Sequence, residues 1–116
     1  MPADPDAHRA KQIGLNEAVF REVNERVETI AQSLSSKPEN ILLVCECGRI
    51  DCTERFEMSV SDYEALRSDP TLFAVARGHA VPGLETVVAA EGPYEVVRKA
   101  IGEATDVAVE TDPRSG

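Results

Sequence analysis

The sequence predicts a small α+β domain built around an antiparallel sheet. Three observations lead to this fold class. Apolar residues recur first at helical spacing over residues 15–34, which is the pattern of an amphipathic helix. Short segments with alternating apolar and polar residues follow, separated by turns rich in Gly, Pro and Asp. The strand-helix-strand spacing of parallel sheets is absent, so the expected order is α-β-β-α-β-β-β with antiparallel hairpins.

The first predicted helix carries one apolar stripe. We expect this stripe to pack on the sheet, although a stripe of this length is also suited to a homodimer interface. Asn16 is a suitable N-terminal cap, and opposite charges four residues apart support a solvated outer face. These pairs are Glu17 with Arg21 and Glu22 with Arg26. The stripe consists of Leu15, Val19, Phe20, Val23, Val27, Ile30, Ala31 and Leu34.

A hairpin with a cysteine-rich turn is expected after the helix. Its strands are predicted at residues 40–46 and 54–60, where apolar runs and alternating side chains indicate β structure. A capping box formed by Ser61 and Glu64 then starts a short helix. The Asp-Pro pair at residues 69–70 stops it.

Three further strands complete the expected sheet. They are predicted at residues 72–77, 85–89 and 94–99. Turn signals separate the last three segments, because Val-Pro-Gly ends at position 83 and Glu-Gly-Pro ends at position 93.

The chain of 116 residues is expected to fold as one domain over residues 14–101. Residues 1–13 are polar with two early prolines, and residues 102–116 are acidic with small side chains, so both ends are predicted to be disordered. Trimming them is expected to leave the melting temperature unchanged. A domain of this size buries a small core and often needs a metal, a disulfide or an oligomer interface.

The three cysteines of the chain lie within eight residues of one another. In an extended strand Cys45 and Cys47 point to the same face, because side chains alternate. Gly48 then permits a sharp turn that brings Cys52 back over them. Cysteines two residues apart are poor disulfide partners, and a third would be left over. Thiolates are preferred zinc ligands, so the segment predicts a Zn²⁺ site that staples the domain.

His79 is the predicted fourth ligand, which completes a Cys₃His tetrahedron. It follows a predicted strand in a Gly-His pair, whereas the other histidine, His8, lies in the segment expected to be disordered. Water or a carboxylate is an alternative fourth ligand. Buried free thiols and a redox-active set are alternative interpretations of the cysteines. Glu46 is expected to face away from the metal and is a poor general base there.

Charge and hydropathy exclude several classes of protein. A net charge of −9 without a cluster of Lys and Arg argues against nucleic acid as a partner. The apolar runs fall short of the about 20 residues that a membrane span needs, and the N-terminus lacks the pattern of a signal peptide. Cysteines without a disulfide pattern fit a reducing compartment. The expectation is a cytoplasmic protein.

Catalytic motifs are not expected, and the protein is predicted not to be an enzyme. The His-x-Glu and Cys-x-x-Cys pairs of zinc deaminases are missing, as are phosphate-binding and dinucleotide-binding glycine loops. Cys52 with His79 as its base is the one catalytic pair to consider, but an orienting third group is not in view.

Several blocks of the sequence resemble a set of small uncharacterised actinobacterial proteins. The resemblance spans residues 17–99 and supports the first helix, the cysteine segment and the Gly-His pair as common features, without implying a substrate. This chain has Arg77 where that family tends to have proline. The blocks are FREVNERV at 20–27, VCEC at 44–47, CTER at 52–55, YEALR at 63–67, GH at 78–79 and ETVV at 85–88.

Taken as a whole, the sequence predicts a non-enzymatic zinc module for protein interaction or regulation. The protein partner is unknown, and the chain is expected to be a monomer or a homodimer. The first alternative is a redox sensor in which oxidation of the cysteines releases zinc. The second is a cysteine-dependent or zinc-dependent enzyme.

Overall fold

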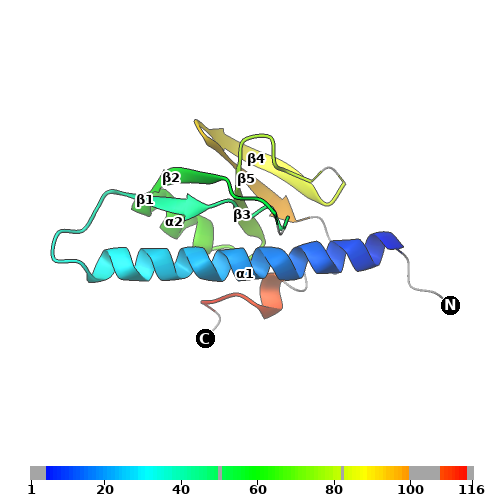
Figure 1. The fold of residues 1–116 in the computed structure, drawn as a ribbon, viewed down its shortest axis with the longest axis horizontal. Helices are drawn as coiled ribbons and strands as arrows, with labels where there is room; N and C mark the ends of the chain where they lie inside the picture. Colours follow the sequence, from blue (N-terminus) through cyan, green and yellow to red (C-terminus); the bar gives the residue numbers. More distant parts are fainter. Residues whose placement is uncertain (1–4, 50, 82, 100–107, 115–116) are drawn as a thin grey trace.

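The computed structural model describes residues 5–49, 51–81, 83–99 and 108–114. The expected order of elements and the α+β class are confirmed. Figure 1 shows the long helix running the length of the molecule, with the strands along one side of it. The elements are α1 (Pro5–Ser33), β1 (Asn40–Val44), β2 (Arg55–Ser59), α2 (Val60–Arg67), β3 (Leu72–Ala76), β4 (Glu85–Glu91) and β5 (Tyr94–Lys99). Neither α1 nor α2 is long and apolar enough to cross a membrane.

The strands form two antiparallel sheets, where the sequence predicted one. β1 pairs with β2, and the second sheet has the order β3-β5-β4. The chain beyond β1 connects them, because the Cys45 amide donates to the Glu54 carbonyl (3.0 Å) and the Glu46 amide donates to the Ala74 carbonyl (2.9 Å). The cysteine segment therefore lies at the junction between the sheets.

The core lies between α1, α2 and the sheets, and aliphatic and aromatic side chains fill it. The rings of Phe56 and Tyr94 connect the two sheets, with centroids 5.3 Å apart. Other members that are fully buried are Leu43, Tyr63, Phe73, Ala74, Val75 and Val97. The N-cap of α2 is Ser59, whose hydroxyl accepts from the Asp62 amide, so the predicted capping box at Ser61 was wrong. Because β2 ends at Ser59, the helix starts one residue before Ser61.

Helix α1 begins well before the predicted start. It includes Pro5 to Ile13, which the sequence placed in a disordered segment. Pro5 occupies the first helical position, where a missing amide proton costs nothing because that amide has no partner in a helix. Ala, Arg, Lys and Gln, which favour helices, fill most of the following positions. Pro5 therefore marks a helix start and not a disordered lead-in, whereas residues 1–4 of the predicted disordered segment lie outside the described residues.

The face of α1 that packs on the domain is also the opposite of the predicted one. Its buried side chains are mostly polar: Glu17, Arg21, Asn24, Glu28 and Ala31. Most of the predicted apolar stripe is exposed instead, namely Leu15, Val19, Val23, Ile30 and Leu34. The predicted outer pair of Glu22 and Arg26 is exposed with an N···O distance of 3.6 Å. Glu17 and Arg21, which were also predicted on the outer face, are both buried.

Residues 108–114 dock on the domain, where the sequence predicted a disordered tail over residues 102–116; the rest of that tail lies outside the described residues. Ala108 is buried, and its carbonyl accepts from Arg21 Nη2 at 2.9 Å. Arg114 forms ion pairs with Glu25 and Glu28 of α1 and with Glu64 of α2. The prediction failed because these partners are 50–89 residues away in sequence, and the segment itself has little apolar residue spacing.

Candidate metal centre

The backbone after β1 places Cys45 and Cys47 on the same side, as the alternation of side chains predicted. The segment remains extended although β1 itself ends at Val44. Gly48 then adopts a positive φ of 80°, a conformation that L side chains rarely adopt. The Cys52 amide donates to the Arg49 carbonyl at 3.1 Å, which closes the turn. Cys52 is thereby brought back to the first two cysteines.

His79 reaches the same place from the loop between β3 and β4. Its amide donates to the Ala76 carbonyl at 3.0 Å. Gly78 precedes it with a φ of 86°, and the Gly78 amide donates to Glu95 Oε1 at 2.8 Å. Hydrogen bonds from two backbone amides and a glycine thus fix the loop, which explains how the histidine is presented with Arg77 before the Gly-His pair.

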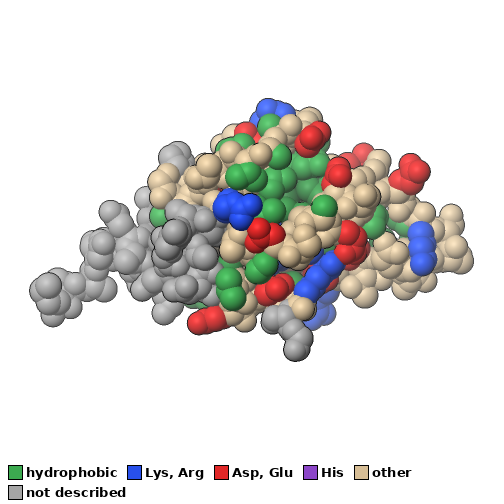
Figure 2. All heavy atoms as spheres, turned by 180° about the vertical axis from the view of Figure 1, so that it is seen from behind, with side chains coloured by type: hydrophobic (Ala, Val, Ile, Leu, Met, Phe, Trp, Pro, Cys, Tyr) green, Lys and Arg blue, Asp and Glu red, His purple; other side chains and the backbone are tan. Residues whose placement is uncertain are grey.

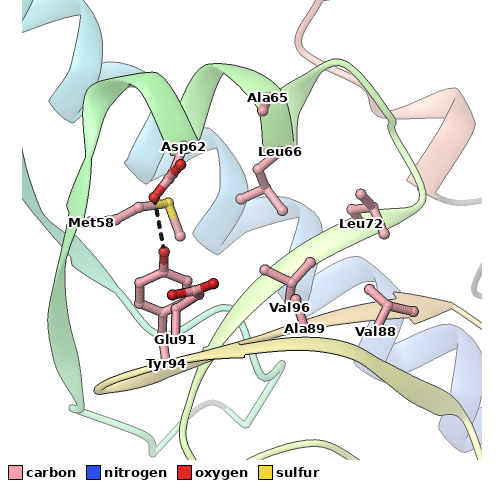
Figure 3. Close-up of a pocket in the computed structure, with 10 residues that line it drawn as sticks. All are labelled: Met58, Asp62, Ala65, Leu66, Leu72, Val88, Ala89, Glu91, Tyr94 and Val96. Carbon is pink, nitrogen blue, oxygen red and sulfur yellow. Dashed lines mark hydrogen bonds between the residues drawn. The ribbon is translucent and has the colours of Figure 1, made fainter.

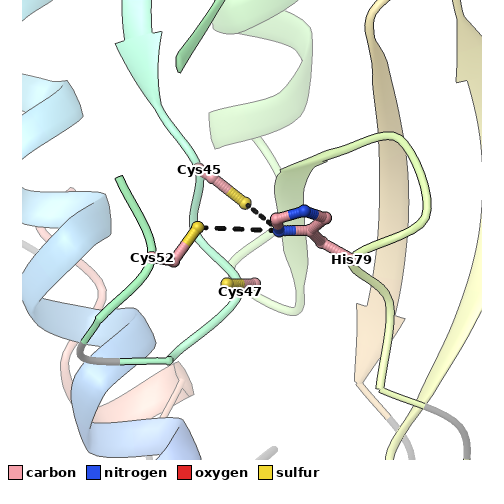
Figure 4. Close-up of side chains that lie close together, drawn as sticks. All are labelled: Cys45, Cys47, Cys52 and His79. Atoms are coloured by element: carbon pink, nitrogen blue, oxygen red, sulfur yellow. Dashed lines mark hydrogen bonds between the residues drawn. The ribbon is translucent and has the colours of Figure 1, made fainter. Parts of the chain in front are cut away.

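The four side chains converge on one point. Figure 4 shows the imidazole of His79 directed at the cysteines, with Nδ1 at 3.6 Å from the Sγ atoms of both Cys45 and Cys52. All four ligand atoms lie within 4.8 Å of one another, and none of the cysteines forms a disulfide. Cys45 and Cys47 are buried, whereas Cys52 and His79 are partly accessible. The cluster could therefore hold a metal ion.

Hydrogen bonds around the sulfurs favour the thiolate form of Cys47. The Cys45 thiol, the Arg49 amide and the other cluster members stabilise the Cys47 thiolate, and the bond from Cys45 contributes most to lowering the Cys47 pKa to about 4. That same bond, together with burial, raises the pKa of Cys45. The Ala76 amide donates to Cys45 Sγ at 3.1 Å and holds this sulfur in place. A thiolate is the form in which cysteine binds metals.

Glu46 points away from the cluster into a second buried site, as predicted. Its Oε1 accepts from Arg67 Nη2 at 2.7 Å and from the Ala74 amide at 3.0 Å. Its Oε2 accepts from Asn24 Nδ2 at 2.6 Å. The side chains of Glu46 and Arg67 are 0% and 1% exposed, so this ion pair lies fully inside the protein. Glu46 is therefore not available as a base at the metal cluster.

Helix α1 holds the cysteine segment from behind. Asn24 pairs with Val44 as a neighbouring strand would, accepting from the Val44 amide at 2.8 Å and donating to its carbonyl at 2.9 Å. Asn16 Nδ2 donates to the Gly48 carbonyl at 2.8 Å. A Cβ atom on Gly48 would lie 2.8 Å from Ile13 Cγ2 and 2.9 Å from the Ile13 carbonyl oxygen. The turn thus needs glycine for close packing as well as for its positive φ.

Sequence reasoning found the four cluster residues but missed the side chains that support them. Asn24 lies in the middle of a helix with apolar spacing, so its sequence position gives no sign of a strand-like partner. The alternation that places Cys45 and Cys47 together does place Glu46 on the other face. A buried carboxylate could have been predicted there, and a buried cation with it. Which arginine supplies that cation is not visible in the sequence.

Among the hollows formed by the described residues, two border the cluster and a third is lined mainly by apolar side chains. The partly accessible side of the cluster opens into a hollow of about 210 Å³, lined by Arg49, Asp51, Thr53 and Glu54 with Cys52 and His79. A second hollow of about 220 Å³ lies between Phe20 and Val23 of α1 and the segments around Cys45 and Cys52. Solvent can therefore approach the cluster at Cys52.

The third hollow, of about 290 Å³, lies between α2 and the second sheet and is mainly apolar. Figure 2 shows apolar side chains gathered in a hollow with acidic ones at its border. In Figure 3 Asp62 and Glu91 lie at one end, where the Tyr94 hydroxyl donates to Asp62 Oδ2 at 3.4 Å. This hollow contains none of the four cluster residues.

No protein-family model, curated protein or solved structure matches this chain.

Proposed function

We propose that this protein is a small non-enzymatic zinc module in which Cys45, Cys47, Cys52 and His79 bind one Zn²⁺. The single observation that carries the proposal is the distance from His79 Nδ1 to two sulfurs, 3.6 Å in each case. A tetrahedral ion with Zn–S bonds of about 2.3 Å and a Zn–N bond of about 2.0–2.1 Å requires an N···S separation of about 3.6 Å.

The metal would act as a structural clamp between the two sheets. Three ligands come from the connection between β1 and β2, whereas His79 comes from the connection between β3 and β4. Four protein ligands fill the tetrahedron and leave no position for a substrate. Such a clamp suits a domain with a small core, because metal binding to the folded chain adds directly to its stability. We propose that the fixed surface serves protein interaction or regulation in the cytoplasm.

Metal analysis tests the proposal directly. Protein purified without chelator is examined by native mass spectrometry and elemental analysis, and we expect one zinc per chain. Replacing the metal with Co²⁺ should give the thiolate charge-transfer and tetrahedral ligand-field absorption bands of an S₃N site. His79→Ala should weaken metal binding and change these bands, whereas the matched control His8→Ala should leave both unchanged. Absence of metal together with freely reactive thiols in the native protein would refute the clamp.

A redox sensor is the second candidate, favoured by the partial exposure of Cys52 in a hollow. Peroxide oxidises the thiolate form of an accessible cysteine, and a bound metal ion would hold Cys52 as a thiolate, because without it burial raises the pKa of Cys52. In this function, a low concentration of peroxide would oxidise Cys52 and release zinc quickly. A thiol reductant would then reverse the oxidation and allow zinc to bind again. Slow release that needs a large excess of peroxide would leave the structural clamp as the function.

A further inference from the structure

The exposed face of α1 carries a row of apolar side chains between Leu15 and Ile30, and Leu34 follows just past the end of the helix. Val19 and Ile30 are 61% and 65% exposed, and Leu15, Val23 and Leu34 are each 40% exposed or more. These five residues are here called the outer stripe. Its part within α1, from Leu15 to Ile30, covers about 23 Å at a rise of about 1.5 Å per residue, and Leu34 lies one residue beyond the end of the helix. A row of exposed apolar side chains of this kind on a small domain marks an interaction site.

The outer stripe is symmetric about a point midway between Asn24 and Glu25. Leu15 and Leu34 are equally far from this point on either side, and so are Val19 and Ile30. If a second copy of the helix packs antiparallel across this point, Leu15 meets Leu34 of the second copy and Val19 meets Ile30 of the second copy. Both contacts occur twice by symmetry. An isologous dimer requires this self-complementarity, whereas a foreign partner does not.

The charges at the centre of the stripe fit the same arrangement. Arg26 and Val23 are also equally far from the midpoint, so Arg26 of each copy lies over Val23 of the other. Its aliphatic part covers the valine, and its guanidinium lies close to Glu22 of the other copy. Glu22 and Arg26 are both exposed and form a pair of 3.6 Å within one helix. Antiparallel packing also places opposite helix dipoles side by side.

The apolar surface continues beyond the helix. Val23 lines the hollow of about 220 Å³ with Phe20 and Val44. Leu42 is two residues before Val44 on β1, so it lies on the same face of the strand, and it is exposed. A second copy seated on the outer stripe can therefore bury β1 residues as well, which brings the contact toward the about 800 Å² per partner of a standard interface.

We propose that two copies of this chain form an isologous dimer through antiparallel packing of their α1 helices along the outer stripe. This proposal does not rest on the metal, because neither the outer stripe nor its inner neighbours on α1 are among the four cluster residues. The metal content and the oligomeric state can therefore fail independently.

Analytical ultracentrifugation of the full chain tests the proposal. We expect a mass of about twice 12.6 kDa at micromolar concentration. Ile30→Glu and Val19→Glu should each raise the dimer dissociation constant by at least about 100-fold, since each places two charges in an apolar contact. The matched control Thr29→Glu, on an exposed position beside the stripe, should change it by less than about threefold. All three variants should keep the metal content and the circular dichroism of the wild type.

The register is tested with a photoreactive phenylalanine analogue at Ser33. The antiparallel dimer predicts crosslinks to peptides around Asn16 of the second copy, because these positions are equally far from the midpoint. Crosslinks between identical positions would indicate a parallel pair and overturn the proposal. A wild-type chain that remains monomeric at high concentration would overturn it as well, as would a dimer that Ile30→Glu and Val19→Glu leave intact.

Discussion

The two sides of the segment Cys45-Glu46-Cys47 accommodate polar side chains inside the protein in two different ways. On one side two thiols, with Cys52 and His79, form a cluster suited to a metal ion. On the other side the Glu46 carboxylate is fully buried and neutralised by Arg67, with Asn24 and the Ala74 amide as further donors. The alternation of an extended backbone produces both sites, one residue apart.

The comparison shows how polar groups replace apolar packing in a small domain. The sulfur side ties loops together through ligands that a metal would hold, whereas the carboxylate side ties α1 and α2 to the sheets through ion pairs and hydrogen bonds. A buried ion pair adds little net stability against apolar residues of the same shape, but removing one partner alone is costly. A bound structural metal, in contrast, contributes directly to folding. Breaking the two sides should therefore have different consequences.

The largest effect is expected on the sulfur side. Chelation of the metal, or Cys47→Ser, should abolish the cooperative thermal transition, because structural zinc contributes about 10 kcal/mol in small peptides and a domain is stable by only about 5–15 kcal/mol. Circular dichroism during heating measures this. A cooperative transition that is unchanged after complete metal removal would contradict the clamp.

Breaking the carboxylate side alone should cost less and can be repaired. Arg67→Met leaves the Glu46 carboxylate buried without its cation, and we expect a loss of about 3–5 kcal/mol of unfolding free energy. The double variant Glu46→Met with Arg67→Met removes both charges and should recover most of that loss. Urea unfolding of the two variants gives the comparison.

Metal content separates the two sides. The double variant should still bind one metal per chain, because neither residue is a ligand. If the double variant is as unstable as the single one, packing and not the buried charge is responsible for the loss. If the folded double variant lacks metal, the two sides are coupled more tightly than the geometry implies.

Removal of residues 108–116 tests how much the hydrogen bonds of a second buried cation on α1, Arg21, contribute to stability. Arg21 lies over the ring of Phe73 at 4.8 Å and donates through Nη2 to the Ala108 carbonyl and to Thr111 Oγ1. The truncation removes these acceptors from a buried guanidinium, so we expect a loss of about 2–4 kcal/mol. Arg114→Ala should cost about 1 kcal/mol or less, because its ion pairs are partly exposed. A truncated chain with wild-type stability would restore the view of a dispensable tail.

The sequence allowed the order of the elements and the sulfur side to be predicted, because both depend on local patterns. Alternation and glycine placement bring Cys45, Cys47 and Cys52 together within eight residues, and ligand chemistry makes the cluster recognisable. The carboxylate side depends on partners far along the chain, such as Arg67 for Glu46 and Ala108 for Arg21. No short-range pattern specifies those pairings.

The orientation of α1 could not be predicted for a related reason. A hydrophobic stripe identifies a helix, but it does not say whether the stripe faces the helix's own domain or another molecule. Here Asn24 and Arg21 have specific partners in the domain, and the stripe is left outside. Partners around the inner face, among them the carbonyls of Val44, Pro70 and Ala108, decide between the two orientations.

The last expected effect is a change of stability with pH, and it concerns Glu28 at the edge of the inner face of α1. Burial, a hydrogen bond with Glu64 and repulsion from Glu25 raise the pKa of Glu28 to about 7, although Arg114 opposes this. The folded protein therefore holds a proton that the unfolded chain releases above its ordinary pKa of 4.5, so stability should fall as pH rises from about 4.5 to 7. The pKa of Glu64 is lowered, mainly by its hydrogen bond with Arg114, and this offsets part of the pH dependence that Glu28 causes. We expect a net change of about 1 kcal/mol.

Glu28→Gln should remove this slope, and urea unfolding of both proteins at several pH values with saturating metal measures the difference between them. Because metal binding weakens equally for both proteins at low pH, identical slopes would show that the pKa of Glu28 is the same in the folded and the unfolded chain.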